Sequence, residues 1–185
     1  MILFSLLGCV GEKAEQALSK GSLSEKKQVL NASSMVTDPA GLSKTTALMK
    51  TVHGNILIKF YPQKAPNTVT RIVELIQQGF YDGITFHRVI PKFVAQAGDP
   101  TALGTGGSGS KLKAEFNDIQ HVKGTIAMAR GQDDKDSADS QFYISLRTLP
   151  HLDGKYTVFA QVIEGLDFLD KLQQGDKILS FSLND

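Results

Sequence analysis

The segment Phe86-His-Arg-Val-Ile-Pro-Lys-Phe-Val-Ala-Gln-Ala-Gly-Asp99 carries the most information about fold and function in this chain of 185 residues. It contains two runs of β-prone residues, 85–90 and 93–97, which are separated by a proline and a lysine. This pattern predicts two short strands joined by a turn. The first run includes Arg88, and a guanidinium is uncommon inside an apolar β run. Arg88 is therefore a candidate functional residue, with a surface salt bridge as the alternative.

Several other short segments also have the composition of strands. Strand signals begin at Thr46, and the clearest apolar, β-prone runs lie at 54–61, 125–129, 141–145 and 157–162. Glycine, aspartate and proline turns separate these runs. Many short strands of antiparallel length favour a mainly β fold, either a closed barrel or a sandwich.

Two helices are predicted among the strands. The first begins at Pro66, with Asn67 or Thr68 as its N-cap, and Gly79 is the residue type expected just after its end. Its predicted buried face consists of Val69, Ile72, Val73 and Ile76. The second helix is predicted over 165–173, with buried positions at Leu166, Leu169 and Leu172.

The overall composition argues against several classes of function. Twenty basic and 19 acidic side chains leave a formal net charge of +1, and no long Lys/Arg cluster supplies a positive field for nucleic acid. No apolar run reaches the roughly 18 residues of a membrane-spanning helix. A single cysteine allows no internal disulfide, and the four histidines lack zinc-binding spacing. We therefore expect no metal and no nucleic-acid partner.

Two local motifs suggest ligand sites but lack the sequence context that such sites require. Residues 104–109, Gly-Thr-Gly-Gly-Ser-Gly, match a dinucleotide-binding pattern, but no long amphipathic helix follows them and no βαβ unit surrounds them. The aspartates at 133, 134, 136 and 139 lack the glycine and the final glutamate of a calcium-binding loop. We interpret the first motif as a flexible loop and the second as a solvated turn.

The beginning of the chain differs from the rest. Leu6-Leu-Gly-Cys9 resembles a bacterial lipobox, where a signal peptide is cut before a cysteine that then carries lipid. The apolar stretch is short and lacks Lys or Arg, so a buried N-terminal strand with a free thiol is the alternative. We expect residues 1–8 to be a lipoprotein signal remnant, Cys9 to be the lipidation site, and 9–45 to be a flexible tether. This organisation predicts a bacterial cell-envelope or periplasmic protein, or a cytoplasmic one if Cys9 carries no lipid.

Three blocks of sequence stand out by their order and spacing. They are the segment 86–99, the segment 124–131 followed by Ser140-Gln-Phe-Tyr-Ile144, and the segment Leu152-Asp-Gly-Lys-Tyr-Thr-Val-Phe159. Together they closely resemble the cyclophilin family of peptidyl-prolyl cis-trans isomerases, in a bacterial form. The resemblance implies a closed eight-stranded antiparallel β-barrel capped by two α-helices, with the domain at 46–185. The strand count and the closure come from the resemblance alone.

The resemblance also implies a reaction. An amide resists rotation by about 18–20 kcal/mol, and before proline the exchange takes tens to hundreds of seconds. An isomerase has to bind the twisted amide better than either planar form, so it needs no nucleophile, metal or cofactor. A guanidinium near the proline nitrogen can donate to the lone pair that twisting releases. By its place in the family pattern, this donor is Arg88.

The remaining site residues follow from the same resemblance. Phe93 and Gln96 join Arg88 as catalytic residues, and Gln96 and Gln141 are expected to orient the arginine or to bind the peptide carbonyl. The residues expected to bind substrate are Val94, Ala129, Gln141, Phe142, Tyr143, Leu152 and Tyr156. Without the resemblance, the apolar members of this set would be interpreted as barrel core.

Several positions depart from the family pattern. Tyr156 stands where many members have histidine, Val94 replaces a commoner methionine, and Tyr143 replaces a phenylalanine. His151 stands where animal members have tryptophan, which argues against strong cyclosporin binding. Lys92 occupies a position where glycine is usual. None of these changes removes the expected donor.

The expected partners are proline-containing peptides and unfolded protein clients, bound by a monomer. The principal hypothesis is an active prolyl isomerase that assists protein folding. The alternative is a non-catalytic proline-peptide binding module or holdase chaperone that uses the same groove. The presence of Arg88 favours activity, because binding alone does not require a cation at the imide nitrogen.

Overall fold

The computed structural model describes residues 39–42 and 44–184, so Cys9, the expected signal remnant and most of the expected tether lie outside the described residues. The elements, in chain order, are α2 (Pro39–Leu42), β1 (Thr46–Thr51), β2 (Gly54–Phe60), α3 (Pro66–Gln77), β3 (Arg88–Ile90), β4 (Val94–Ala97), β5 (Thr125–Met128), β6 (Phe142–Ser145), the 3₁₀ turn η1 (Pro150–Leu152), β7 (Val158–Glu164), α4 (Leu166–Leu169) and β8 (Ile178–Asn184).

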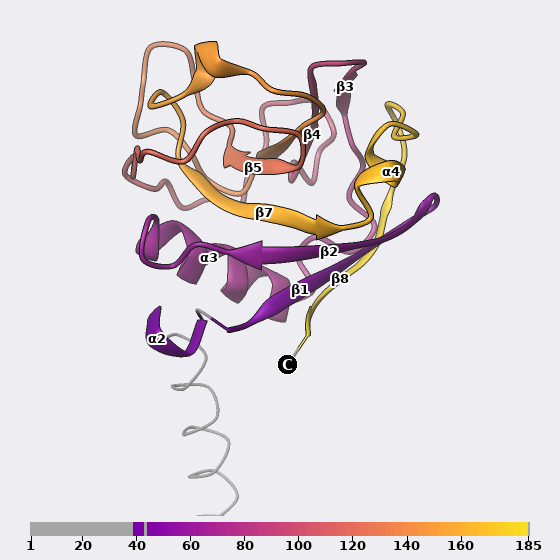
Figure 1. Cartoon of the computed structure of the whole chain (residues 1–185), viewed down its shortest axis with the longest axis horizontal. Helices are drawn as coiled ribbons and strands as arrows, with labels where there is room; N and C mark the ends of the chain where they lie inside the picture. The colour runs from indigo at the N-terminus through magenta and orange to yellow at the C-terminus, as the bar shows by residue number, and fades with distance from the viewer. Residues whose placement is uncertain (1–38, 43, 185) are drawn as a thin grey trace, which may run out of the picture. The chain divides into compact units, whose positions relative to one another are not determined.

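The strands form one antiparallel sheet of eight strands in the order β3-β4-β6-β5-β7-β2-β1-β8. The sheet curls into a half-barrel, α3 packs against β8 and β7, and α4 packs against β2 (Figure 1). The structure thus shows a mainly β fold with the expected eight strands and two principal helices. It does not show the expected closed barrel, because the strand pairing is open between β3 and β8.

Local contacts nevertheless join the two open edges next to β3. A bridge pairs Thr85 with Lys177, just before β3 and just before β8. The Phe86 N–H donates to the Asp176 carbonyl at 2.8 Å, and the Ile178 N–H donates to the Ile84 carbonyl at 2.9 Å. These contacts fix the chain immediately before Arg88.

Helix α3 follows the predicted hydrophobic pattern but has a different N-terminal cap. Val69, Ile72, Val73 and Ile76 are buried, and Gly79 adopts φ 67° just beyond the helix, as predicted. The predicted N-caps Asn67 and Thr68 are wrong, because the N-cap position is Ala65 and its side chain makes no capping bond. The carboxylate of Glu115 supplies the missing acceptor: it receives the N–H of Asn67 at 3.0 Å and that of Thr68 at 2.8 Å. A residue almost 50 positions away in sequence thus satisfies the free helix donors.

Other element boundaries also differ from the predictions. The helix predicted over 165–173 is only the single turn Leu166–Leu169. Beyond it the chain continues in tighter turns, in which the Lys171 N–H donates to the Phe168 carbonyl at 3.1 Å. Leu166 is exposed rather than buried. Strand β8 was not expected, and it forms by pairing with β1 from the far end of the chain. Within the range predicted as a tether, α2 is a helical turn whose Leu42 is fully buried.

The β3–β4 turn places the candidate residues. Lys92 adopts φ 59°, a left-handed conformation that costs an ordinary residue about 1–2 kcal/mol. The Phe93 N–H donates to the Ile90 carbonyl at 3.0 Å and closes the turn. This tight connection explains why glycine suits position 92 elsewhere in the family pattern.

Within the described ranges, no helix has the length and apolarity needed to cross a bilayer.

We predict that Glu115→Gln lowers the free energy of unfolding by about 1–2 kcal/mol, because the amide NH₂ of glutamine then faces N–H donors at the start of α3. Urea unfolding measures the change, with the exposed Glu164→Gln as the matched control. Equal stability of the two variants would show that Glu115 does not cap the helix.

Candidate functional site

A cavity of about 260 Å³ lies over β4 and β6, and we call it the aromatic cavity. Its lining consists of Arg88, Phe93, Val94, Gln96, Ala129, Arg130, Tyr143, Leu152 and Tyr156. All of these except Arg130 were predicted site residues. The fold therefore brings together side chains from β3, β4, β6, the segment after β5, η1 and the loop before β7.

Strand register explains how the polar members of the cavity meet. Arg88 of β3 lies opposite Gln96 of β4, and Gln96 lies opposite Tyr143 of β6. Cross-strand neighbours point to the same face of a sheet. The three side chains therefore form one row across three adjacent strands, and this row borders the cavity.

The cavity floor is part of a hydrophobic cluster. Val94 and Tyr143 are buried in it, and Phe93, Leu152 and Tyr156 pack on it while remaining partly exposed. The Tyr143 and Tyr156 rings meet edge to face at 5.6 Å between centroids. These residues thus fulfil both interpretations of the sequence, core packing and the lining of an apolar slot.

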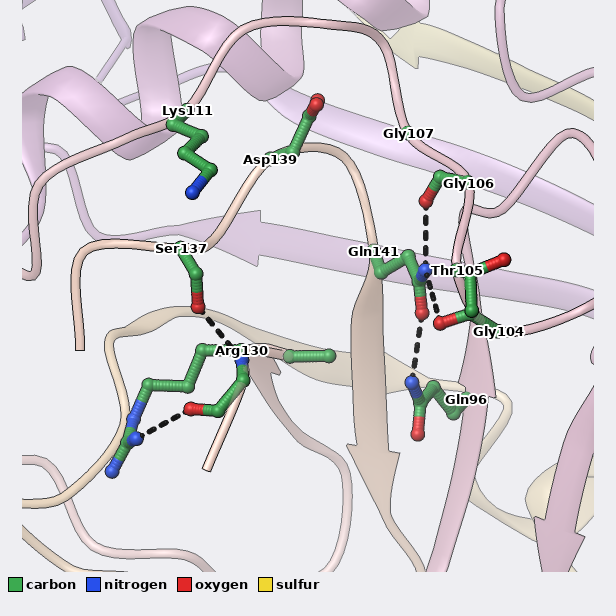
Figure 2. Close-up of a pocket in the computed structure, with 12 residues that line it drawn as sticks. Gln96, Gly104, Thr105, Gly106, Gly107, Lys111, Arg130, Ser137, Asp139 and Gln141 are labelled. Atoms are coloured by element: carbon green, nitrogen blue, oxygen red, sulfur yellow. Dashed lines mark hydrogen bonds between the residues drawn. The ribbon is translucent and has the colours of Figure 1, made fainter. Parts of the chain in front are cut away.

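A chain of hydrogen bonds fixes the polar side of the cavity. The Arg88 Nη1 donates to Gln96 Oε1 at 3.3 Å, and the Gln96 Nε2 donates to Gln141 Oε1 at 2.9 Å. The Gln141 Nε2 in turn donates to the carbonyls of Gly106 at 2.8 Å and Gly104 at 3.1 Å, as Figure 2 shows. The side-chain amides of Gln96 and Gln141 each have defined donors and acceptors, so the positions of their oxygen and nitrogen atoms are determined. The guanidinium keeps further N–H donors for a ligand.

The salt bridge considered as the alternative role of Arg88 is not present. Among the salt bridges of the described residues none involves Arg88. Asp82 instead accepts the Phe181 N–H at 2.8 Å, and Asp99 accepts N–H groups of its own loop. Arg88 is therefore exposed at the rim of the cavity with a glutamine as its hydrogen-bond partner.

A second cavity of about 320 Å³ adjoins the first, and we call it the glycine-loop cavity (Figure 2). It shares Gln96, Ala129 and Arg130 with the aromatic cavity. The rest of its lining comprises Gly104, Thr105, Gly106, Gly107, Lys111, Gly131, Ser137, Asp139 and Gln141. In Figure 2 the side chain of Arg130 extends away from Gln96 and Gln141.

The glycine motif at 104–109 forms an irregular loop, as predicted, and a buried carboxylate holds its shape. Asp99 is 1% exposed and accepts the N–H of Thr101 at 2.7 Å and that of Gly106 at 3.0 Å. Burial alone would raise the pKa of Asp99, but hydrogen bonds from the Thr101 side chain and from the backbone of Gly106, Thr101 and Gly104 lower it to about 2. The carboxylate therefore stays ionised and keeps the loop beside Gln141.

Two aspartates of the segment 133–139 accept backbone hydrogen bonds, Asp134 within its own turn and Asp139 from the glycine motif. Asp139 accepts the N–H groups of Ser108 and Gly109, each at 2.8 Å, and Asp134 accepts the Asp136 N–H at 3.0 Å. Within the part of the chain that the structure describes, no three His, Cys, Asp or Glu side chains gather closely enough to hold a metal ion.

Two predicted binding residues lie elsewhere than expected. Phe142 does not line either cavity: it is 1% exposed and contacts Tyr81 and Phe181, since it points to the opposite face of β6 from Tyr143. Gln141 lines the glycine-loop cavity rather than the aromatic cavity. Its Oε1 accepts the Gln96 Nε2–H, and Gln96 in turn accepts from Arg88.

The sequence analysis missed two residues at the site. The guanidinium of Arg130 lies 4.9 Å from the centroid of the Tyr156 ring and donates to the Lys155 carbonyl at 3.2 Å. His121 is fully buried, and its Nε2 lies 2.9 Å from the Tyr143 hydroxyl. Arg130 directly follows Ala129, which offered a local signal. His121 had none, because its partners lie more than 20 positions away in sequence.

Fold and site together define a class of protein: a curled β half-barrel with an apolar slot, a guanidinium at its rim and side-chain amides that fix it. The sequence comparisons agree with this class. The profile described as cyclophilin type peptidyl-prolyl cis-trans isomerase/CLD matches residues 46–181. The chain belongs to the cyclophilin family of peptidyl-prolyl cis-trans isomerases.

Two bacterial relatives carry the name peptidyl-prolyl cis-trans isomerase. The Synechococcus elongatus protein is 45% identical over 141 residues, which cover 75% of this chain and 96% of that protein. The protein of Helicobacter pylori strain 26695 is 46% identical over 144 residues, covering 75% of this chain and 87% of its own. These relationships support the same enzyme class for this chain.

The solved structures show the same fold. A Cryptosporidium parvum cyclophilin type peptidyl-prolyl cis-trans isomerase, solved in the presence of the dipeptide Ala-Pro, superposes with a TM-score of 0.71 at 24% identity. The match covers 76% of this chain and 99% of that one.

We predict that Asp99→Asn lowers the free energy of unfolding by roughly 2 kcal/mol near neutral pH, because the folded pKa of about 2 lies below the ordinary value of 3.8. The carboxylate stabilises the fold fully above its ordinary pKa, and this contribution is lost as the pH falls toward about 2. Urea unfolding of both proteins over this pH range should therefore show their stabilities converging in acid. Exposed Asp167→Asn is the control, and a difference that does not change with pH contradicts the role of the charge.

Proposed function

We propose that Arg88 is the catalytic donor of this isomerase and that the aromatic cavity holds the proline ring of the substrate. Twisting the X–Pro amide localises the nitrogen lone pair, which a neighbouring guanidinium N–H can then bind. The observation that carries this proposal is the position of Arg88, exposed at the rim of the cavity and tethered to Gln96. Arg88 therefore acts on an X–Pro amide whose proline ring is already held in the aromatic cavity.

The other side chains are assigned to orientation and binding. Gln96 accepts one guanidinium N–H and so limits the directions in which Arg88 can point. Phe93 and Leu152 offer partly exposed apolar surface, and Val94 and Tyr143 close the floor. A pyrrolidine ring needs such a slot and no charged group within it. The proposed catalytic residues are thus Arg88, Gln96 and Phe93.

The glycine-loop cavity is proposed to receive a side chain of the substrate segment that flanks the proline. It adjoins the aromatic cavity through Gln96, Ala129 and Arg130. Ala129 keeps the shared wall low. A peptide that crosses this wall contacts both cavities at once.

The energetic demand on the site is moderate. Lowering the barrier by about 7 kcal/mol accelerates rotation roughly 10⁵-fold. A single preorganised donor at a developing lone pair contributes about 3–4 kcal/mol in comparable sites. The remainder has to come from holding the proline ring and the flanking chain in the twisted geometry.

We predict that Arg88→Ala lowers kcat/KM for an Ala-Pro peptide at least about 100-fold, because the donor to the imide nitrogen is lost. A protease-coupled assay measures the rate, and calorimetry measures peptide binding, which we expect to change much less. Exposed Arg147→Ala, which removes the same charge outside both cavities, is the matched control.

The same experiment tests the alternative function. A wild-type chain that binds the peptide without accelerating isomerisation is a proline-peptide binding module or holdase. Equal rates for wild type and Arg88→Ala, both above the spontaneous rate, would remove Arg88 from the catalytic role and leave the family assignment intact.

We further infer that the half-barrel closes into a barrel beside the site. The bridge between Thr85 and Lys177 and the bonds of Phe86 and Ile178 support this inference. Closure at this point anchors the start of β3. Arg88 then projects from a fixed edge of the sheet.

We propose that the enzyme assists the folding of unfolded protein clients and acts as a monomer. Prolyl isomerisation takes tens of seconds and limits many folding reactions, so its acceleration is useful wherever chains fold.

We also propose that Cys9 carries a lipid and anchors the enzyme in a bacterial cell envelope. The support is the sequence Leu6-Leu-Gly-Cys9 and the 29 residues between Cys9 and α2, which would span the distance to a membrane surface. We expect the chain expressed in a bacterium to partition into detergent, and Cys9→Ala to stay in the aqueous phase. Cys9→Ser is a second variant without the thiol, and unchanged partition of both variants rules out the anchor.

A further inference from the structure

His121 is completely buried beneath the aromatic cavity and links two of its walls. Its Nε2 lies 2.9 Å from the hydroxyl of Tyr143, and its Nδ1 lies 2.9 Å from Oδ1 of Asp153. The same carboxylate oxygen accepts the backbone N–H of His121 at 2.7 Å. Both imidazole nitrogens therefore have partners.

Chemistry determines the direction of these bonds. The hydrogen bond from the His121 backbone, above all, holds the pKa of Asp153 below its usual range, so the carboxylate is ionised and can only accept. The Nδ1 of His121 must then carry a hydrogen. In the neutral imidazole the Nε2 is an acceptor, and the phenol of Tyr143, whose pKa burial raises, donates to it. The hydrogen bonds thus run in one direction: Tyr143 donates to His121, and His121 donates to Asp153.

The two ends of this chain belong to opposite parts of the cavity. Tyr143 forms the floor from strand β6, while Asp153 directly follows Leu152 in the wall formed by η1. The carbonyl of His121 also accepts the Leu149 N–H at 2.8 Å, at the other end of η1. His121 thus contacts both ends of the η1 wall and, through Tyr143, the floor of the cavity.

The aromatic packing places His121 in the same assembly. Its ring is nearly parallel to that of Tyr143 at 5.9 Å between centroids, and the Tyr156 ring meets it edge-on at 6.5 Å. Tyr143, Leu152 and Tyr156 all line the cavity, but His121 does not. Any effect of His121 on the substrate therefore passes through these neighbours.

We propose that His121 is a positioning residue of the isomerase: held between Asp153 and Tyr143, it sets the separation between the floor and the η1 wall that receives the proline ring. This inference rests on the proposed use of the aromatic cavity as the proline site. Because the side-chain hydrogen bonds and ring contacts of His121 within the described residues involve Asp153, Tyr143 and Tyr156 and not Arg88, we expect it to govern substrate binding and to leave the donor step unaffected.

The test separates the two bonds of the imidazole. In His121→Asn the amide remains near the Nδ1 position and can still donate to Asp153, but it cannot reach Tyr143. In His121→Gln the amide reaches the Nε2 position and can accept from Tyr143. We expect His121→Asn to raise KM for an Ala-Pro peptide about tenfold with kcat within about twofold, and His121→Gln to restore much of the loss.

His53→Asn is the matched control. His53 is also paired with an aspartate, with its Nε2 2.7 Å from Asp176, but it lies outside both cavities. We expect its KM to equal that of the wild type. A rise in KM that is the same for His53→Asn and His121→Asn reflects general loosening and overturns the proposal.

Tyr143→Phe removes the same hydrogen bond from the other side while keeping the ring. If the bond transmits the effect, the double variant His121→Asn/Tyr143→Phe has the KM of His121→Asn alone. Increases in KM that multiply in the double variant show independent actions and overturn the proposal. Near-UV circular dichroism checks that each variant is folded, and Tyr143→Phe provides the test if His121→Asn is not.

A spectroscopic measurement on the wild type needs no variant and no turnover. Long-range ¹H–¹⁵N spectra at a pH of about 8, above the usual histidine pKa, distinguish the two neutral tautomers. We expect the ring hydrogen of His121 on Nδ1, and a hydrogen on Nε2 instead would overturn the assigned direction of the hydrogen bonds from Tyr143 to Asp153. Absence of wild-type isomerase activity would contradict the proposed function, whereas activity with an unchanged KM in His121→Asn would contradict the positioning role alone.

Discussion

The hydrogen-bonded row from Arg88 through Gln96 and Gln141 to the glycine loop is the constraint on which the site depends. A flexible guanidinium at the surface has many rotamers, and an unrestrained one would lose much entropy on meeting a substrate. Here the side-chain amides of Gln96 and Gln141, each held in one orientation, limit the rotamers of Arg88 before a substrate binds. The loop supplies the final acceptors, and the ionised Asp99 keeps the loop in place. The ionised Asp99 therefore influences the position of the Arg88 guanidinium through a series of uncharged groups.

The sheet provides the second element of preorganisation. Antiparallel register places one side chain from each of three strands in a row, so the polar edge of the site lies on regular structure. The apolar part depends on less regular segments, namely η1 and the loop that contains Tyr156. His121 and Asp153 connect these segments to the sheet. Regular strands thus hold Arg88 and Gln96, and a buried polar contact holds the η1 wall of the aromatic cavity.

Much of this was predictable from local patterns. Alternating and apolar runs gave most strands, and the spacing of Val69 and Ile72 gave α3. The residues of the aromatic cavity other than Arg130 came from the resemblance of three motif blocks to the cyclophilin family, because the apolar ones taken alone indicate only barrel core. The failures involve partners that are distant in sequence. Glu115 caps α3 across 47 residues, and β8 forms only against β1. Phe142 was assigned to the cavity because sequence proximity does not reveal which side of a strand faces it.

Strand β6 is buried on both faces, and its neighbouring residues serve different purposes. Phe142 fills the interior beside Tyr81 and Phe181, whereas Tyr143 lines the aromatic cavity. A substitution at Phe142 therefore changes the packing of the interior without altering the lining of the cavity, whereas a substitution at Tyr143 changes both the lining and the packing.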